Sequence, residues 1–442
     1  MATGLIGIIG AGPIGLEAAL LARELGHRVR VYEAGAVGEH FLRYGPVRLF
    51  TPFHMNATER GRKRLRAAGL RLPADDAILT AEEFRERYLV PLSRLPDLEG
   101  SITARTRVTG IGREGLVKGQ SIGPDGNPPR ASRRFLIRVQ PDGGAGRFER
   151  ADAVIDASGV YACPNATGPG GLPALGEESL GSLLEQHLPA ITREARARYA
   201  GRRILLIGDG RSAANALADI DALVREGEDA ARTRVEWIHR DRGGPWLAPV
   251  PAEELERLPS LRDLDSRANR IAREAPWLNR RPGAEVASYR LLPSGEVEVT
   301  LAARGTAGDR AAAPREGAAR EGDRLVVDRV LALVGYRPDL SLFRELQVHL
   351  CYASEGPMAL AAAILASRPN AGAAGSAGAP VGCLSQSTHG PESLKSPEPD
   401  FYVLGAKSYG RNPNFLLSLG HRQIEDALGL IGSASGITAA AR

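Results

Sequence analysis

Cysteine is scarce in this sequence of 442 residues. Its three cysteines, Cys163, Cys351 and Cys383, lie far apart, and they form no C-x-x-C or other close pair. Disulfide frameworks and zinc sites need cysteines at short, regular spacings. The sequence therefore predicts no metal site and no disulfide framework, and this pattern is typical of a protein in the reducing cytoplasm.

Lysine and long apolar runs are scarce too. Only Lys63, Lys118, Lys395 and Lys407 are lysines, so arginine supplies most of the basic charge behind the net charge of +5. The densest basic run, residues 60–66, lacks aromatic side chains that could stack on bases, which argues against a nucleic-acid partner. There is no run of 18 apolar residues and no basic segment ahead of the apolar N-terminus, so we expect neither a membrane span nor a secretion signal.

Two glycine-rich turns, about 200 residues apart, are the strongest positive signal in the sequence. The first is Gly10-Ala11-Gly12-Pro13-Ile14-Gly15, which follows the apolar run 5–9. The second is Gly208-Asp209-Gly210-Arg211-Ser212-Ala213, which follows the apolar run 204–207. Because an Ala/Leu-rich stretch follows each turn, each region has the strand-turn-helix pattern of a Rossmann unit, which binds one dinucleotide. We therefore expect an α/β protein with two Rossmann-like dinucleotide-binding domains.

The first turn has the features of an FAD site. Gly10 permits the tight turn, Gly12 lets the backbone approach a pyrophosphate, and Gly15 allows close packing of helix on strand. Pro13 and Ile14 begin a helix whose N-terminal N–H groups favour phosphate. Glu33, 18 residues after Gly15, ends the second strand and is expected to accept hydrogen bonds from ribose hydroxyls. The alternative is a glycine turn that serves packing alone.

The second turn favours NADPH. Its return strand, residues 234–239, ends in Arg240-Asp241-Arg242 rather than in an acid. Arginine binds a phosphate through two parallel N–H groups, so Arg240 and Arg242 are expected to bind the 2′-phosphate of NADPH. The alternative, in a chain rich in arginine, is that both side chains are simply solvated and that NADH is used.

Three further segments resemble the flavoproteins with two dinucleotide-binding domains, a group that includes flavin-containing monooxygenases and pyridine-nucleotide disulfide reductases. Ile155-Asp156-Ala157-Ser158-Gly159 is similar to the A-T-G motif of that group, and 333–339 is similar to its G-x-x-P-[ND] segment. The segment 401–406 is similar to a strand ending in Gly-Asp, whose acid binds the ribityl chain, but Ala406 stands at the acid position.

This resemblance implies an NADPH domain inserted into an FAD domain. The predicted boundaries are residues 1–162 and 336–442 for the FAD domain and 163–335 for the NADPH domain. Gly159, Gly405 and Ser408 are implied FAD contacts. Lys407, Ser408 and Tyr409 are the nearest candidates to replace the missing acid.

The chain departs from both branches of the group. It lacks the close cysteine pair of a disulfide reductase, and Cys163 alone is more typical of packing. It also lacks the F-x-G-x-x-x-H fingerprint of the monooxygenases before the second turn and their G-G-x-W segment after Glu33. The string 407–413, Lys-Ser-Tyr-Gly-Arg-Asn-Pro, is similar to one in a bacterial subgroup labelled only as FAD-dependent oxidoreductases.

Two segments are candidates for the reacting centre. The loop 44–56 is rich in aromatic residues, which suits a substrate pocket but equally an ordinary packed loop. The second segment, 407–414, precedes the last helix, expected over 414–430, whose N-terminus would stabilise negative charge on a reduced flavin. The candidate substrate residues are Arg48, Phe50, Phe53, Asn56 and Tyr409, and the candidate catalytic residues are Lys407, Arg411, Asn414 and, as a general base, His54.

The sequence thus predicts an FAD enzyme that consumes NADPH. We expect reduced flavin to meet oxygen, form a flavin hydroperoxide and oxygenate a nitrogen or sulfur of a small molecule. A reductase of a quinone, a thiol compound or a protein partner is the first alternative, and a non-catalytic flavin-binding sensor is the second, since fold analogy alone does not fix a function. The oligomeric state is left open, with a homodimer as one option.

Overall fold

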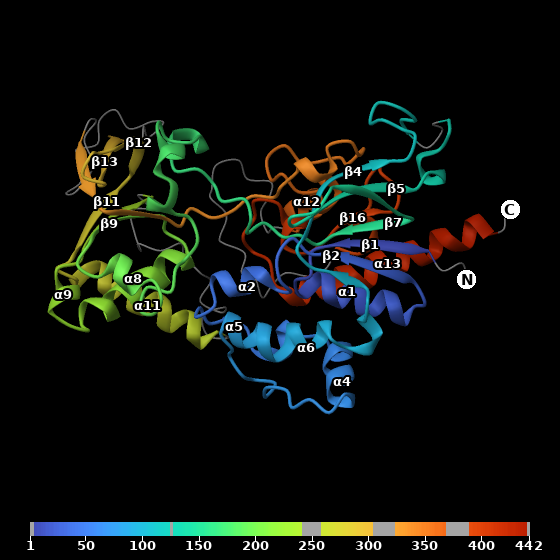
Figure 1. Ribbon diagram of the computed structural model, residues 1–442, viewed down its shortest axis with the longest axis horizontal. Helices are drawn as coiled ribbons and strands as arrows, with labels where there is room; N and C mark the ends of the chain where they lie inside the picture. The colour runs from blue at the N-terminus through green and yellow to red at the C-terminus, as the bar shows by residue number, and fades with distance from the viewer. Residues whose placement is uncertain (1–3, 124–126, 241–257, 304–322, 368–388, 440–442) are drawn as a thin grey trace. The chain divides into compact units, whose positions relative to one another are not determined.

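The structure is a computed structural model that describes residues 4–123, 127–240, 258–303, 323–367 and 389–439 (Figure 1). The chain divides into two compact units. Unit 1 comprises Met1–Leu42, Thr51–Cys163 and Arg337–Arg442, and unit 2 comprises Arg43–Phe50 and Pro164–Tyr336. Unit 2 is thus an insertion in the chain of unit 1, and the predicted fold class is confirmed. The main divisions fall one residue after the predicted ones, and the short segment 43–50 was not expected in unit 2.

A parallel sheet of five strands, in the order β16-β7-β1-β2-β3, forms the centre of unit 1. Its strands are β1 (Leu5–Ile9), β2 (Arg28–Tyr32), β3 (Ile102–Thr103), β7 (Ala153–Asp156) and β16 (Phe401–Val403). The apolar run of β1 is typical of a parallel strand that is covered on both faces. Helices α1 (Pro13–Glu24) and α13 (Leu417–Ala439) pack against each other beside this sheet (Figure 1).

The register of the sheet aligns the carboxyl ends of its strands. Ile9 lies opposite Tyr32 of β2 on one side and opposite Asp156 of β7 on the other, and Asp156 lies opposite Val403 of β16. The chain leaves β1 toward β2 and later returns to the opposite neighbour, β7, so the strand order reverses beside β1. In open α/β sheets, ligands bind outside the carboxyl ends at such a reversal.

A second sheet of unit 1 is antiparallel and consists of β4 (Thr106–Arg113), β5 (Phe135–Pro141) and β6 (Arg147–Ala151). Strands β5 and β6 form a hairpin around the turn at 141–144. Its apolar face joins the core of the parallel sheet, where Ile137 packs near Val154 and Phe401.

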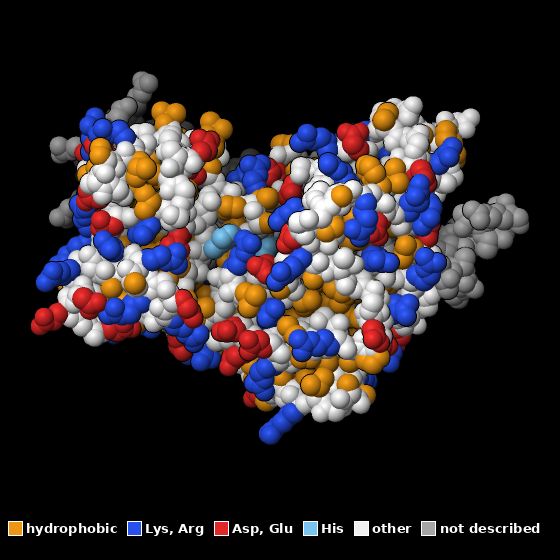
Figure 2. Space-filling view, in the orientation of Figure 1, with side chains coloured by type: hydrophobic (Ala, Val, Ile, Leu, Met, Phe, Trp, Pro, Cys, Tyr) orange, Lys and Arg blue, Asp and Glu red, His pale blue; other side chains and the backbone are white. Residues whose placement is uncertain are grey.

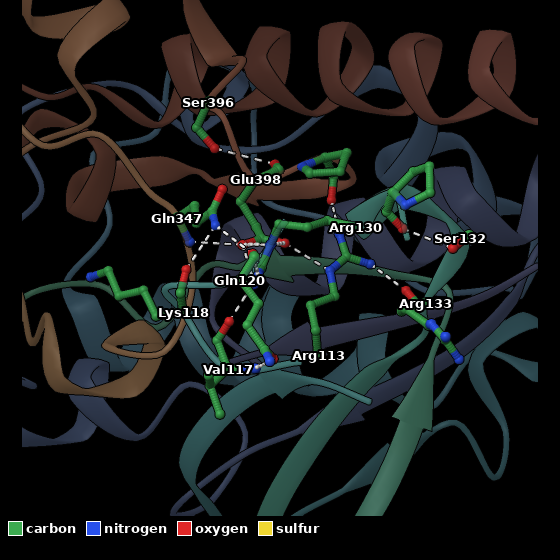
Figure 3. A network of polar contacts seen from close by, with 12 residues as sticks. Arg113, Val117, Lys118, Gln120, Arg130, Ser132, Arg133, Gln347, Ser396 and Glu398 are labelled. Atoms are coloured by element: carbon green, nitrogen blue, oxygen red, sulfur yellow. Dashed lines mark hydrogen bonds and ion pairs between the residues drawn. The ribbon is translucent and has the colours of Figure 1, made fainter. Parts of the chain in front are cut away.

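A buried charged network joins this antiparallel sheet to the segment ahead of β16 (Figure 3). Glu398 accepts hydrogen bonds from Arg113 Nε at 2.7 Å and from Arg130 Nε at 3.0 Å. The backbone N–H of Gln347 donates to the second carboxylate oxygen, Oε2, at 2.7 Å. All three charged side chains are buried, so one carboxylate is shared by two buried guanidinium groups inside unit 1.

Unit 2 repeats the design. Its parallel sheet has the strand order β11-β10-β9-β15-β8. Helix α8 follows strand β9 in the chain. Unit 2 also contains an antiparallel sheet, β12-β13-β14. The elements are β8 (Leu184–Glu185), β9 (Arg203–Ile207), β10 (Arg234–His239), β11 (Leu278–Pro282), β12 (Ala284–Leu291), β13 (Val297–Ala303), β14 (Arg324–Val327), β15 (Arg329–Ala332), α7 (Arg196–Tyr199), α8 (Arg211–Val224), α9 (Glu228–Ala231) and α11 (Pro259–Glu274).

The shorter helices of unit 1 are α2 (Glu39–Arg43), α3 (Phe53–Asn56), α4 (Glu59–Ala67), α5 (Ala81–Phe84), α6 (Val90–Ser93) and α12 (Met358–Ala366). Helix α5 begins with a capping box, in which the side chains of Thr80 and Glu83 each accept the backbone N–H of the other. The last helix begins at Leu417 rather than at Asn414, and the N–H of Asn414 donates to the Oδ1 of Asn412 at 3.1 Å.

The surface and the helix lengths bear on two expected absences. On the face shown in Figure 2, arginine and lysine side chains lie among acidic ones rather than in one continuous basic stripe. Within the part of the chain that the structure describes, no helix is long and apolar enough to cross a membrane.

Candidate functional site

The first glycine turn forms an open cradle at the carboxyl end of β1. Gly10 has φ 98°, and a Cβ there would lie 2.8 Å from the carbonyl oxygen of Ala157. A Cβ on Gly12, by contrast, would meet nothing within 4 Å. Helix α1 begins at Pro13, and no side chain caps it. An uncapped helix N-terminus beside open backbone is the arrangement that binds a phosphate.

Glu33 is held in place by the backbone at the end of β2. One carboxylate oxygen accepts the N–H of Ala11 at 2.8 Å, and the other accepts the N–H of Gly35 at 2.8 Å. Burial raises the pKa of Glu33, and these two backbone hydrogen bonds act in the opposite direction. Each oxygen retains acceptor capacity beyond the one bond described, so the carboxylate suits a ribose hydroxyl. The residues of the first turn therefore fit the adenosine and pyrophosphate of FAD.

The turn after β7 contains a buried ion pair that the sequence did not indicate. Lys407 Nζ lies 2.6 Å from Asp156 Oδ2, and both side chains are 0% exposed. Asp156 Oδ1 accepts the N–H of Ser158 at 3.1 Å and its hydroxyl at 2.7 Å. Gly159 follows with φ 72°. Lys407 was expected to offer charge to the flavin, but its ammonium is instead fully buried against Asp156.

Hydrogen bonds within unit 1 hold the segment after β16 in place. Gly405 donates its N–H to Gln423 Oε1 at 2.9 Å, and Ser408 donates its hydroxyl to the carbonyl of Gly405 at 2.8 Å. Tyr409 packs edge-on against Phe415, and burial raises the pKa of Tyr409 to about 12. Because Ser408 and Tyr409 are buried, their side chains have little surface to offer a ligand.

Arg411 and Asn414 are the accessible candidates of that segment. Arg411 is exposed, and its backbone N–H donates to the carbonyl of Ser354 at 2.7 Å. Asn414 is half-buried, three residues before α13 begins. Both side chains are thus at least partly accessible near the N-terminal end of α13.

The loop 44–56 is divided between the two units. Arg48 and Phe50 belong to unit 2, where Arg48 is exposed and Phe50 is half-buried. Phe53, His54 and Asn56 belong to unit 1. The residues of the loop therefore do not all belong to one unit, although the sequence was compatible with a single pocket lined by the whole loop.

The unit 1 residues of this loop have structural partners. Phe53 is 0% exposed and packs against the rings of Phe84 and Tyr88. Asn56 is buried and exchanges hydrogen bonds with Thr51 at 2.7 and 2.9 Å. Phe53 and Asn56 therefore contribute to the packing of unit 1, and their role as substrate contacts stays a prediction. His54 is exposed, with Nδ1 2.9 Å from the carbonyl oxygen of Asp75.

The second glycine turn repeats the cradle in unit 2. Gly208 has φ 125°, and a Cβ there would collide with the carbonyl group of Leu333. A Cβ on Gly210 would meet nothing within 4 Å, and no side chain caps α8. Ala213 is fully buried at the close-packing position. Ser212 is half-buried in the first turn of the helix, so this turn also fits a pyrophosphate.

Arg240 lies where β10 ends and is paired with the glycine turn itself. Its guanidinium contacts Asp209 through NH2 at 2.7 Å and Nε at 2.9 Å, and its side chain is 58% exposed. Arg211 Nε lies 3.4 Å from Asp265 Oδ1. Arg242 lies outside the described residues. The arrangement places one accessible, oriented guanidinium at the end of the return strand.

Sequence reasoning also missed His421, in the first turns of α13. Its Nε2 is buried and has no hydrogen-bond partner among the described residues. Burial lowers the pKa of His421 to about 4, so the ring is neutral at pH 7. The sequence signal that could have singled out His421 was its position near the N-terminus of the last helix.

The described cysteines form no disulfide with each other. Cys163 and Cys351 are free thiols, and Cys383 lies outside the described residues. Burial and the nearby Asp339 raise the pKa of Cys163. A thiol that stays protonated is a poor nucleophile. Among the described residues there is also no cluster of side chains that could hold a metal ion.

Comparison with known proteins supports the fold. No protein-family model matches the chain, and no curated protein sequence matches it either. Bacillithiol disulfide reductase Bdr from Bacillus cereus is 16% identical, with a TM-score of 0.64 over 98% of this chain and 100% of its own. DfoA, a cadaverine monooxygenase from Erwinia amylovora whose structure is bound to FAD, is 13% identical, with a TM-score of 0.58 over 97% and 94%. Ornithine hydroxylase PvdA from Pseudomonas aeruginosa is 14% identical, with a TM-score of 0.53 over 97% and 98%.

These likenesses confirm the predicted resemblance at the level of the fold. They extend over nearly the whole length of each chain, and they include both reductases and monooxygenases. At such low identity a shared fold does not assign a reaction. The reaction therefore has to be argued from the residues of this chain.

Proposed function

We propose that this protein is an oxidoreductase that binds FAD at the first glycine turn and is reduced by NADPH bound at the second. The observation that carries the proposal is the duplicated cradle. In each unit one strand of the parallel sheet, β1 or β9, is followed by a glycine where a Cβ would strike backbone, then by a glycine open to space and an uncapped helix. Two sites of this kind suit a bound flavin and a visiting nicotinamide.

The two sites differ in the side chain at the end of the return strand. In unit 1 this is Glu33, an acceptor for ribose hydroxyls that would repel a 2′-phosphate. In unit 2 it is Arg240, which is accessible and would attract one. This difference supports FAD in unit 1 and NADPH in unit 2.

When bound, FAD supplies the hydride and electron chemistry, and the protein supplies binding, orientation and electrostatics. Gly12 and the N-terminus of α1 would bind the pyrophosphate. Arg411 and the N-terminus of α13 would favour negative charge on a reduced flavin ring, because both carry positive potential.

For the acceptor side, we propose a monooxygenase that transfers an oxygen atom to a nitrogen or sulfur of a small molecule. The support is chemical: the sequence has no close cysteine pair, and the Cys163 thiol is kept protonated by its surroundings. Oxygen is then the simplest acceptor that requires no further group from the protein. The fold is also shared with two proteins described as a cadaverine monooxygenase and an ornithine hydroxylase.

A reductase of a small thiol compound, a quinone or a protein partner is the second candidate. The observation that favours it is the fold likeness to a bacillithiol disulfide reductase, which extends over 98% of this chain. Such an enzyme would pass electrons to its acceptor without a cysteine pair of its own.

Substrate-dependent oxidation of NADPH separates the two candidates. The purified protein is assayed with a panel of primary amines, thioethers, quinones and low-molecular-weight disulfides, in air and under nitrogen. A monooxygenase consumes NADPH only in air and converts an amine or thioether into a product 16 mass units heavier, an increase set by one oxygen atom. Equal NADPH consumption under nitrogen with a quinone or disulfide would reject the monooxygenase and support the reductase. No turnover with any acceptor would support the flavin-binding sensor.

A further inference from the structure

Lys407 is a fully buried cation of unit 1, in the short 3-10 helix Gly405–Tyr409 that follows β16. Its ammonium contacts Asp156 Oδ2 at 2.6 Å and Ser158 Oγ at 3.1 Å, and it lies 5.2 Å from the centre of the Phe343 ring. The partner carboxylate is equally buried. Burying a charge costs free energy unless its partners are well placed. The partners of Lys407 therefore have to be held in position, and this has consequences for the two turns that carry them.

The first consequence concerns the turn after β7. Asp156 accepts the N–H and the hydroxyl of Ser158 with Oδ1 and the ammonium of Lys407 with Oδ2, so both of its oxygens are engaged. This turn abuts the first glycine turn, since a Cβ on Gly10 would lie 2.8 Å from the carbonyl of Ala157. The conformation of residues 157–159 therefore depends on the ion pair.

The second consequence concerns the turn after β16. The carbonyl of Lys407 accepts the N–H of Gly410 at 3.0 Å, and Gly405 and Gly410 adopt φ of 73° and 61°. The side chain of Lys407 thus ties the connection between β16 and α13 to the end of β7. The two turns lie at the carboxyl ends of neighbouring strands, since Val403 is paired with Asp156.

The third consequence is electrostatic. Because the Asp156 carboxylate neutralises Lys407 at 2.6 Å, the pair as a whole presents little net charge to its surroundings. Lys407 is thus poorly suited to stabilise negative charge on a bound ligand, in contrast to the exposed Arg411.

We propose that Lys407 is a positioning residue for FAD, acting through Asp156 and Ser158. The buried pair fixes the turns 157–159 and 405–410 in the conformations that receive the flavin end of the cofactor. The inference rests on the proposed FAD site in unit 1. Its direct consequence is that FAD affinity depends on a residue with no exposed surface.

The test compares two buried ion pairs of the same unit. Lys407→Met removes the charge at the proposed site with little change in side-chain volume. Glu398→Gln weakens the buried pair in Figure 3, which joins other elements, and serves as the matched control. Each variant is stripped of flavin and titrated with FAD, the dissociation constant is measured by flavin fluorescence, and thermal unfolding is recorded in parallel without FAD.

We expect Lys407→Met to weaken FAD binding by roughly tenfold or more, because a single deletion leaves the Asp156 carboxylate buried and unpaired. We expect Glu398→Gln to lower the melting temperature while its FAD dissociation constant stays within about threefold of the wild-type value, as sites without shared partners act independently. FAD affinity of Lys407→Met within threefold of wild type, or an equal loss in both variants, would overturn the inference.

A second variant covers the case in which Lys407→Met does not fold. Lys407→Met with Asp156→Leu replaces the pair by apolar side chains, which generally restores stability. Its FAD affinity is expected to remain below that of the wild type, since the anchor of Ser158 is lost, and wild-type affinity would refute the positioning role. Wild-type protein that binds no FAD at all would instead refute the proposed function, so the two failures are distinct.

Discussion

Replacing Arg240 by alanine is expected to weaken the use of NADPH without affecting the use of NADH. The guanidinium is oriented by two contacts with Asp209, at 2.7 and 2.9 Å, and its side chain is 58% exposed. Only NADPH carries the 2′-phosphate that such a group would bind. The variant therefore tests both the identity of the second dinucleotide and the residue that selects it.

The size of the effect follows from the exposure of the side chain. A hydrogen bond to a charged group contributes about 1.5–3 kcal/mol when it is well shielded. Because solvent screens a half-exposed arginine, we expect the loss of binding free energy to lie near the lower end of this range. Such a loss corresponds to about a tenfold increase in the KM for NADPH. Asp209→Asn keeps the charge of Arg240 but weakens its anchor, so we expect a smaller increase of the same sign.

The assay is anaerobic reduction of the flavin by NADPH and by NADH, followed over a range of concentrations. Arg234→Ala is the matched control, because Arg234 begins the same strand and bonds to the carbonyls of Ala231 and Thr233. Parallel losses with NADPH and NADH in Arg240→Ala, or no loss with either, would refute the assignment of Arg240 to the 2′-phosphate.

Three further predictions concern unit 1. Gly10→Ala should abolish FAD binding, because φ of 98° and a backbone oxygen 2.8 Å from the added Cβ both oppose it, whereas Gly110→Ala, in open space, should bind FAD normally in the same titration. Glu398→Gln should lower the free energy of unfolding by about 3 kcal/mol in urea titrations, since it leaves buried arginines poorly compensated; a loss below about 1 kcal/mol would contradict the buried network. Burial lowers the pKa of His421 to about 4 from 6.5. The free energy of unfolding is therefore at its full value above pH 6.5, and it decreases by about 3 kcal/mol in total as the pH falls from 6.5 toward 4. His421→Gln should therefore lose less stability than the wild type between pH 7 and pH 5, and identical pH profiles would count against the burial of this ring.

The two nucleotide cradles could be predicted because their signals are local. The strand, the glycine turn and the helix are contiguous, and the roles of Gly10 and Gly208 follow from backbone geometry within that short stretch. The same is true of the capping box at Thr80, whose partner is three residues away. Fold class and the insertion of one domain in another then followed from the order of these elements.

The interior of the flavin-side site could not be predicted, because its partners are distant in sequence. Lys407 and Asp156 are 251 residues apart, and only the pairing of β16 with β7 brings them together. From the sequence, Lys407 was a free cation beside a helix N-terminus. In the structure its charge is neutralised inside the protein.

The loop 44–56 shows a second limit of sequence reasoning. Aromatic residues in a loop are compatible with a pocket and equally with a core. Phe53 packs on Phe84 and Tyr88, which lie about 30 residues further along the chain, and nothing within the loop itself indicates those partners. Burial of an aromatic loop residue is decided by tertiary contacts rather than by composition.

Anaerobic mixing of the purified protein with NADPH tests the central claim most directly. The account predicts that the protein carries FAD with visible flavin absorbance, that NADPH bleaches this absorbance under nitrogen, and that NADH does so only at higher concentration. Protein that neither retains nor takes up FAD, or bound flavin that NADPH and NADH both fail to bleach, would contradict it.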